Sequence, residues 1–278
     1  MTIAVTGATG QLGRLAIAAL QARGASPVAL VRSPEKAADL GVEARAFDYW
    51  TAAPEALKGV DTLVLISTND FNDRAGQHKN VIAAAKAAGV GRIIYTSILK
   101  GDASPMKLLT SDHVTTEAAL AASGIPATIL RNGWYSENYT GSLGAALQHG
   151  AIIGSAGDGR VSTAARKDYA EAIAVTALDA SHAGKTYELA GDDSYTLADL
   201  AAEVAKQSGK PVAFVNLPEA DYAKALEGFG LPAGFAAVLA ESDFSASKGS
   251  LFDDNRTLSR LIGRPTTPVA ETVRAALA

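Results

Sequence analysis

The sequence contains no cysteine, and this absence excludes several kinds of chemistry. No disulfide, thiolate nucleophile or zinc site with thiolate ligands can form, and the sequence predicts no metal site. No apolar run approaches the ~18 residues that a membrane span requires. Because a strand pattern begins at Thr2, the N-terminus leaves no room for a signal peptide, and we expect a cytoplasmic protein.

Charged residues are also scarce, at 19% of the chain, and the net charge is −4. Without a basic patch the chain offers nothing to a nucleic-acid backbone. Hydrophobic residues make up 48% of the 278 positions, which is typical of a compact α/β protein. The length exceeds a usual domain of ~150 residues, so we expect one large domain with an added lobe, or two domains that share a core.

A glycine-rich turn near the N-terminus joins an apolar run to a helical pattern. Glycines recur at Gly7, Gly10 and Gly13, a spacing that allows a sharp turn, a close approach to pyrophosphate and tight helix packing. The helix that follows would direct its free N–H groups at the phosphates. The expected cofactor contacts in this turn are Thr6, Gly7, Thr9, Gly10, Gln11, Leu12 and Gly13.

Short β-branched runs then alternate with alanine-rich helical patterns. This alternation predicts an α/β fold, a Rossmann-type doubly wound parallel sheet with helices on both faces. The expected strands are Thr2–Val5, Pro27–Val31, Glu43–Phe47, Thr62–Ser67, Arg92–Ser97 and Ala127–Leu130.

The rhythm changes after Leu130. We expect a short helix from Asp168, one more sheet strand at Thr186–Ala190, and a lone strand at Val212–Val215 in an otherwise helical region. The predicted division is an NADPH-binding Rossmann domain and a smaller, mainly helical substrate-binding lobe. The first comprises residues 1–131 with segments near 156–191, and the second comprises 132–155 and 192–278.

Ligands of such sheets bind at the carboxyl ends of the strands, so the residues there indicate the cofactor. An acidic residue after the second strand would favour NAD, but Arg32 stands there and can hold the 2′-phosphate of NADPH through two hydrogen bonds. A solvated arginine is the alternative. Asp48 is placed to reach the adenine amine, or is an ordinary loop aspartate. Ser67 and Thr96 end strands near the expected nicotinamide ribose, or cap loops.

A helix after the fifth strand carries His113 and Glu117, which share one face at this spacing. In dehydrogenases of the Tyr-x-x-x-Lys type, this helix carries a tyrosine, which acts as the acid, and a lysine. This chain has neither the tyrosine nor the lysine on that helix. Two interpretations stay open. The pair forms an ion pair on the helix surface, or His113 faces the cofactor as a proton donor or ribose contact.

Several stretches together resemble the bacterial type 2 NAD(P)H:quinone oxidoreductases, which are NmrA-like, atypical short-chain dehydrogenases. The stretches are Ile3–Gly13, Tyr95–Ser97, His113 with Glu117, Leu130–Tyr139 and Ser247–Gly249. The resemblance spans nearly the whole chain, and 131–139 is its most specific part. It implies a Rossmann domain with a small C-terminal lobe, NADPH as cofactor without flavin, and quinones as hydride acceptors.

The side chains after the sixth strand suit a quinone. Trp134, Tyr135 and Tyr139 offer flat faces for a ring, while Asn132 and Asn138 offer amide donors to its carbonyl oxygens. Core packing explains one or two of these aromatics equally well. His113 and Tyr135 are the catalytic candidates. The sequence leaves a homodimer open.

Three other functions stay open. The chain could be an NADP sensor that controls a partner, like the NmrA regulators, for which loss of the catalytic tyrosine is natural. It could also reduce another conjugated acceptor, such as a triphenylmethane dye. A scaffold with a vestigial site is the third, which the intact glycine turn and Arg32 disfavour.

Overall fold

The structure is a computed structural model that describes all 278 residues. The chain forms two compact units. Unit 1 comprises 1–98, 112–132 and 166–187, and unit 2 comprises 99–111, 133–165 and 188–278. No helix combines the length and apolar character that crossing a bilayer requires.

Unit 1 is built on a seven-stranded sheet of order β3-β2-β1-β4-β5-β6-β8, which confirms the expected Rossmann-type α/β fold. Neighbouring strands from β3 to β6 are all parallel. The strands are β1 (Ile3–Thr6), β2 (Val28–Val31), β3 (Ala44–Ala46), β4 (Thr62–Leu65), β5 (Arg92–Ile98), β6 (Ala127–Asn132) and β8 (Thr186–Leu189). The order reverses between β1 and β4, and the crevice at such a switch point binds dinucleotides in this fold class.

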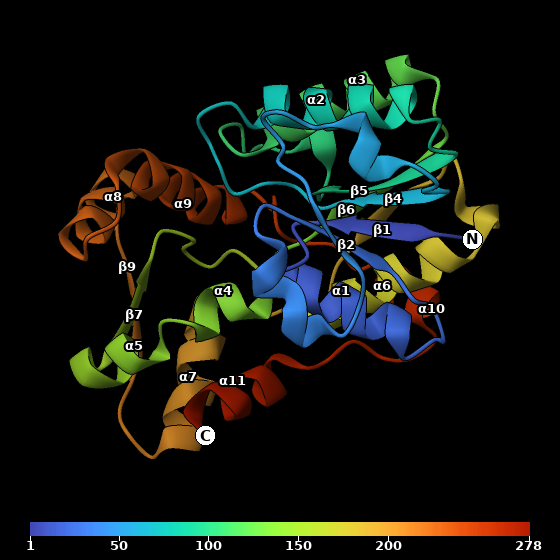
Figure 1. The fold of residues 1–278 in the computed structure, drawn as a ribbon. Coiled ribbons are helices and arrows are strands. Elements are labelled where there is room, and N and C mark those ends of the chain that lie inside the picture. The colour runs from blue at the N-terminus through green and yellow to red at the C-terminus, as the bar shows by residue number, and fades with distance from the viewer. The chain divides into compact units, whose positions relative to one another are not determined.

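Helices cover both faces of this sheet. Figure 1 shows α2 and α3 on one face and α1 and α6 on the other, and α1 packs against α6. β1, β2, β4 and β5 are buried along their whole length, as expected for strands covered on both sides. The helices are α1 (Gln11–Gln21), α2 (Arg74–Ala87), α3 (Thr110–Ser123) and α6 (Arg166–Leu178), with short 3₁₀ turns η1 (Pro34–Leu40), η2 (Pro54–Leu57), η3 (Gly101–Ala103) and η4 (Ala180–His182).

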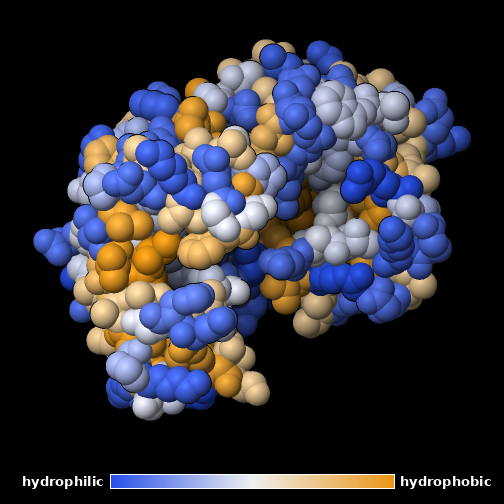
Figure 2. Space-filling model, turned by 90° about the vertical axis from the view of Figure 1, so that its left-hand side faces the viewer, coloured by the Kyte–Doolittle hydropathy of each residue, from blue (hydrophilic) through white to orange (hydrophobic).

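Unit 2 is mainly helical. Its two strands, β7 (Ala151–Gly154) and β9 (Ala213–Asn216), pair in parallel, and α7 packs against both. Its helices are α4 (Ser136–Thr140), α5 (Leu143–His149), α7 (Leu197–Ser208), α8 (Glu219–Gly228), α9 (Ala233–Ala246), α10 (Thr257–Ile262) and α11 (Val269–Leu277). Figure 2 faces the side that carries α8 and α9, where hydrophobic patches lie among hydrophilic ones. Phe229, beside the α8–α9 connection, is 63% exposed.

Two expectations about elements were wrong. The strand near Val212–Val215 is not alone, because β7 pairs with it from a stretch whose glycines hide the strand pattern. The helix expected from Asp168 begins two residues earlier, at Arg166, and runs for 13 residues. Asp168 is completely buried in it, so a charged side chain was a poor guide to the start of this helix.

The glycine turn gives a test of the fold. A Cβ on Gly13 would lie 2.2 Å from the carbonyl oxygen of Gly7 and 2.7 Å from Cα of Ala8, both of which are backbone atoms. We therefore expect Gly13→Ala to lower the free energy of unfolding by about 3 kcal/mol, since the helix must move away from the turn. Urea denaturation measures the change.

Gly144 is the matched control, because it lies in α5 and a Cβ there meets nothing within 4 Å. Gly144→Ala should be neutral, or stabilising by at most about 1 kcal/mol. An equal and small effect of both substitutions would show that the turn does not restrict α1.

Candidate functional site

The glycine turn has the geometry of a phosphate cradle. Gly7 has a φ of 59°, which glycine adopts without strain, and the Gly10 N–H donates to the Gly7 carbonyl at 2.9 Å. Gly10 is the N-cap of α1, and this cap makes no side-chain hydrogen bond. The first turn of α1 also contains no acidic residue. Its free N–H groups and positive dipole end are therefore available to an anion.

Thr6 connects the strands beneath this turn. Its hydroxyl donates to the Val64 carbonyl at 3.2 Å, and accepts from the Ile66 N–H at 3.0 Å and from the Tyr49 hydroxyl at 2.7 Å. Tyr49 was not among the expected site residues. These contacts occupy the Thr6 hydroxyl, so its side chain supports the turn. A contact of the Thr6 backbone with a cofactor stays a prediction.

Ser67 and Thr96 are brought together at the next pair of strand ends. The Ser67 N–H donates to the Thr96 hydroxyl at 2.9 Å, and Thr96 is buried. This bond joins the segment after β4 to β5. It uses the Ser67 N–H and not the Ser67 hydroxyl. Ser67 thus remains a candidate cofactor contact, and Thr96 holds it in place.

Arg32 follows β2 directly and is exposed, as a contact to a free phosphate requires. Arg14 of α1 lies between the glycine turn and η1, which begins just after Arg32. Its guanidinium donates to the carbonyl of Thr9 at 3.1 Å and pairs with Asp39 at 2.5 Å. Asp48 accepts the Trp50 N–H at 2.8 Å in a local turn, so one of its carboxylate oxygens has a structural role.

His113 is buried and does not pair with Glu117, so the expected surface ion pair was wrong. Glu117 instead accepts two hydrogen bonds from the Arg131 guanidinium, at 3.0 and 2.6 Å, and one from the Ser97 hydroxyl at 2.5 Å. Arg131 lies on β6. Its planar guanidinium can bind both carboxylate oxygens of Glu117 at once, which the imidazole of His113 cannot do.

The partners of His113 are buried as well. Its Nδ1 lies 2.8 Å from the Tyr95 hydroxyl, and its Nε2 lies 3.5 Å from the Arg74 guanidinium. Burial first, and then the charge of Arg74, lower the pKa of His113 well below its usual value. This direction disfavours an imidazolium at neutral pH. A ribose contact stays a prediction.

His78 and Arg74 were not expected at the site. Burial, followed by the Arg74 charge, lowers the pKa of His78 to about 3. His78 Nε2 accepts the Thr68 N–H at 3.1 Å, and its Nδ1 lies 2.9 Å from the Thr116 hydroxyl. In the sequence, His78 stands three residues before Val81, on the face that α2 buries, and such a position usually belongs to the core.

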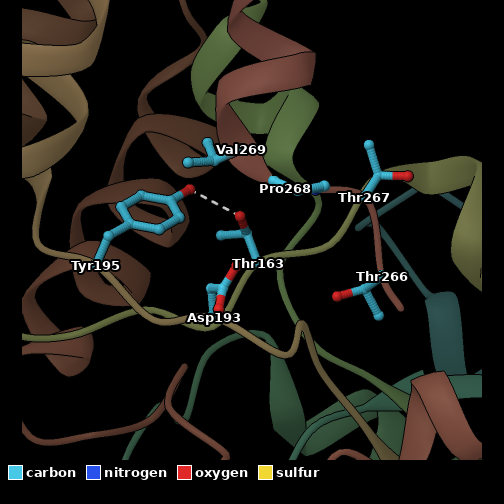
Figure 3. A pocket seen from close by; sticks show the side chains of 7 residues that line it. All are labelled: Thr163, Asp193, Tyr195, Thr266, Thr267, Pro268 and Val269. Atoms are coloured by element: carbon cyan, nitrogen blue, oxygen red, sulfur yellow. Dashed lines mark hydrogen bonds between the residues drawn. The ribbon is translucent and has the colours of Figure 1, made fainter. Parts of the chain in front are cut away.

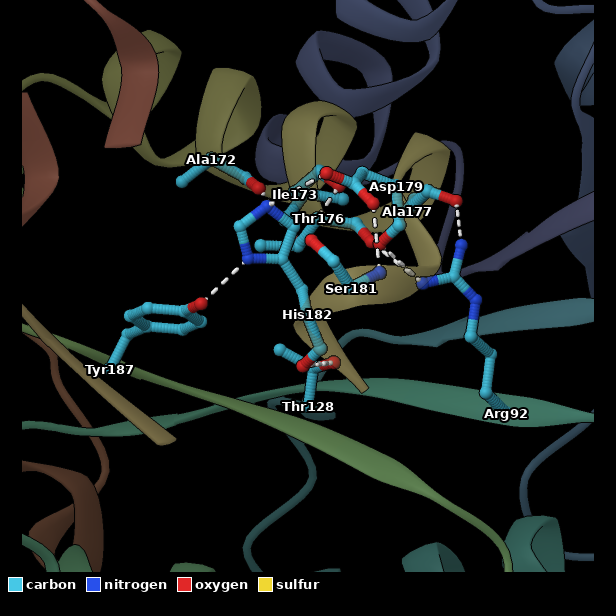
Figure 4. Close-up of polar contacts among 10 residues, drawn as sticks. All are labelled: Arg92, Thr128, Ala172, Ile173, Thr176, Ala177, Asp179, Ser181, His182 and Tyr187. Carbon is cyan, nitrogen blue, oxygen red and sulfur yellow. Dashed lines mark hydrogen bonds and ion pairs between the residues drawn. The ribbon is translucent and has the colours of Figure 1, made fainter. Parts of the chain in front are cut away.

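A second polar cluster lies at the opposite, amino-terminal edge of the sheet (Figure 4); Arg92 is buried there, whereas His182 and Tyr187 are half-buried. Arg92, the first residue of β5, donates to the carbonyls of Thr176 and Asp179 at 3.0 and 2.9 Å, and also to that of Ala177. His182 Nδ1 lies 2.6 Å from the Tyr187 hydroxyl. None of the expected site residues takes part, so this cluster serves the fold.

The aromatic segment begins with Asn132, the last residue of β6 in unit 1, and continues in unit 2. Asn132 is 4% exposed, and neither atom of its amide has a hydrogen-bond partner. Trp134 and Tyr135 are half-buried, and Asn138 is exposed. Tyr139 donates its hydroxyl to Asp243 at 3.3 Å, so its ring rather than its oxygen is free for another role.

Hydroxyl groups fix the segment that holds Tyr135. The Ser136 and Thr163 hydroxyls lie 2.8 Å apart, and the Thr163 and Tyr195 hydroxyls 2.7 Å apart. Figure 3 shows the second bond in a small pocket that Asp193 and residues 266–269 also line. No expected site residue lines this pocket. No group of three or more His, Asp or Glu side chains in the structure could hold a metal ion.

The family profile that matches this sequence is that of the NmrA-like family, over residues 1–269. The chain belongs to the NmrA-like family. Within it, quinone oxidoreductase 2 of Escherichia coli (strain K12) is 55% identical over 278 residues, which cover 98% of this chain and 97% of that protein. The family resemblance stated from the sequence is confirmed.

Solved structures of similar proteins agree with this placement. The NADPH-dependent quinone oxidoreductase QOR2 from Escherichia coli, complexed with NADPH, has a TM-score of 0.95 and 54% identity, with 99% of this chain and 100% of that chain covered. The triphenylmethane reductase of Citrobacter sp., complexed with NADP(H), has a TM-score of 0.91 and 36% identity, with coverage of 99% and 100%. One structure contains NADPH and the other NADP(H), which agrees with the cofactor that the sequence predicts for this chain.

The buried histidines give a test by pH. An unfolded His78 takes up a proton below pH 6.5, whereas the folded protein resists this until about pH 3. The free energy of unfolding should therefore fall as the pH drops through this window, by about 1.4 kcal/mol per pH unit for one histidine. Urea denaturation over a pH series would show it.

His78→Gln removes this titration, so its unfolding free energy should depend less steeply on pH than that of the parent protein. The remaining slope comes from His113, whose pKa is lowered for the same reasons, and from carboxyl groups with lowered pKa values, such as Asp70, Asp179 and Asp199. Parallel pH curves for parent and variant would contradict the buried neutral state of His78.

Proposed function

We propose that this protein is an NADPH-dependent quinone reductase. The observation that carries the proposal is the intact phosphate cradle, in which only glycine fits at Gly13 and α1 has an uncapped N-terminus. Arg32 at the end of β2 and the similarity to an NADPH-dependent quinone oxidoreductase over nearly the whole chain support it further.

NADPH fits the residues that are present. Gly7, Gly10 and Gly13 would hold the pyrophosphate, Arg32 the 2′-phosphate, and Ser67 the nicotinamide ribose. Asp48 would reach the adenine with its second oxygen. When bound, NADPH supplies the hydride, and the protein binds, orients and excludes water. These assignments are part of the proposal.

The quinone would contact the aromatic segment. Trp134, Tyr135 and Tyr139 would flank the ring, and Asn132 and Asn138 would donate to its carbonyl oxygens. Asn132 is suited to this because its buried amide lacks a protein partner. A reduced quinone is a stabilised anion that water can protonate, so a neutral His113 does not prevent the reaction. A cytoplasmic location and a homodimer belong to the same proposal.

The proposal is tested by adding a simple benzoquinone to purified, flavin-free protein and following the loss of NADPH absorbance. We expect steady oxidation of NADPH over many turnovers. Binding of NADPH without turnover would favour the NADP sensor instead. Oxidation with triphenylmethane dyes but not with quinones would favour the second acceptor class, which the similarity to triphenylmethane reductase makes worth testing.

Cofactor choice gives a second test. If Arg32 binds the 2′-phosphate, its charge-assisted hydrogen bonds contribute ~1.5–3 kcal/mol, or roughly a ten- to hundredfold preference for NADPH. Arg32→Ala should remove this preference and leave NADH binding nearly unchanged, as measured by titration. Arg23→Ala is the control, because Arg23 pairs with Glu171 at 3.7 Å and serves the fold. Equal binding of NADPH and NADH by the parent protein would refute the role of Arg32.

A further inference from the structure

The loop after β4 starts the half of the sheet on which a bound nicotinamide is expected. The strand order reverses between β1 and β4, and a dinucleotide lies across such a point with one half on each side. The glycine turn and Arg32 follow β1 and β2, so they belong to the adenosine half. Ser67 and Thr68 follow β4 and belong to the other half.

The peptide groups of Thr68 are held from both sides by α2. The Thr68 N–H donates to His78 Nε2 at 3.1 Å, and the Thr68 carbonyl accepts from Arg74 Nε at 2.9 Å. Arg74 and His78 are four residues apart, so one face of α2 provides both contacts. With the bond from Ser67 to Thr96, three side chains fix two consecutive loop residues.

The two holding residues are themselves fixed. His78 Nε2 accepts a hydrogen bond, so Nδ1 carries the proton and points at the Thr116 hydroxyl, which in turn donates to the Asp112 carbonyl at 2.7 Å. Arg74 is 3% exposed. Burial lowers the pKa of Arg74, and the charges of Tyr95 and Asp112 partly offset this. Its guanidinium stacks over Phe71 at 4.2 Å. A buried cation is costly unless its donors find acceptors, and the Thr68 carbonyl is the acceptor of Arg74 Nε.

We propose that Arg74 and His78 are positioning residues, which hold the Thr68 peptide, and through it Ser67, in the conformation that binds the nicotinamide half of NADPH. This inference rests on the proposed function. It adds two residues that contact neither the phosphates nor the quinone in that proposal. Their effect on the cofactor passes through the loop.

The test compares two ligands, NADPH and 2′-phospho-ADP-ribose, which lacks the nicotinamide. His78→Ala leaves the Thr68 N–H without its acceptor, so the loop gains other conformations. We expect the Kd of NADPH to rise about tenfold and that of 2′-phospho-ADP-ribose to change less than about twofold. Isothermal titration calorimetry measures both constants. Arg74→Met should act in the same direction.

The conservative variant and the opposite edge of the sheet provide controls. His78→Gln keeps an acceptor for the Thr68 N–H and should restore most of the NADPH affinity. Arg92→Met and His182→Ala remove the same residue types from the polar cluster at the amino-terminal edge. These two should lower the melting temperature but leave the ratio of the two dissociation constants unchanged.

If His78→Ala leaves the ratio of the two dissociation constants unchanged, the positioning role is overturned and the proposed function stays intact. Failure of the parent protein to bind NADPH would refute both. If the variants do not fold, nuclear magnetic resonance of the parent protein decides. His78 should carry its proton on Nδ1, and the Thr68 amide should shift with NADPH more than with 2′-phospho-ADP-ribose. Equal shifts, or a proton on Nε2, would refute the inference.

Discussion

The close approach of α1 to the turn before it is the constraint on which the nucleotide edge depends. A side chain on Gly13 would collide with the backbone of Gly7 and Ala8, so the sequence must have glycine there. This contact sets where the first N–H groups of α1 point. Beneath it, the Thr6 hydroxyl of β1 forms three hydrogen bonds, with Val64 of β4, with Ile66 and with Tyr49, which hold this edge together.

The two edges of the sheet use the same residue types differently. At the amino-terminal edge, Arg92 is surrounded by main-chain carbonyls that satisfy its guanidinium. At the carboxyl edge, Arg74 donates its Nε–H to the Thr68 carbonyl and lies near two histidines whose pKa values are lowered. Buried ionisable groups with perturbed pKa values cluster at functional sites, although structural networks also produce them. Here the cluster lies on the edge that carries the glycine turn.

Much of the fold could be predicted from the sequence because the signals are local. The buried strands β1, β4 and β5 are short β-branched runs, and the spacing of Gly7, Gly10 and Gly13 predicts the turn after β1. The hydrogen-bond partners of the site residues could not be predicted in the same way. His113 and Glu117 share a helix face, but Glu117 binds Arg131, which is 14 residues away along the chain and arrives on a neighbouring strand. A planar fork from β6 outcompetes the local neighbour.

Some site residues were not predicted from the sequence for the same reason. Tyr49 lies in a loop, and Arg74 and His78 lie on a helix with ordinary polar neighbours, so nothing in their local sequence marks them. Only the parallel pairing of β1, β4 and β5 places Thr6, Thr68 and Tyr95 within their reach. Similarly, β7 becomes recognisable as a strand only through its pairing with β9.

The central claim is that hydride passes directly from NADPH to a quinone on this protein without flavin. It is tested most directly by single-turnover kinetics with NADPH deuterated at one or the other C4 position of the nicotinamide. Direct transfer predicts slower oxidation by quinone with one of the two deuterated forms only, because the bound ring presents one face to the acceptor. The same rate with both forms and with unlabelled NADPH, or no oxidation by flavin-free protein, would contradict the account.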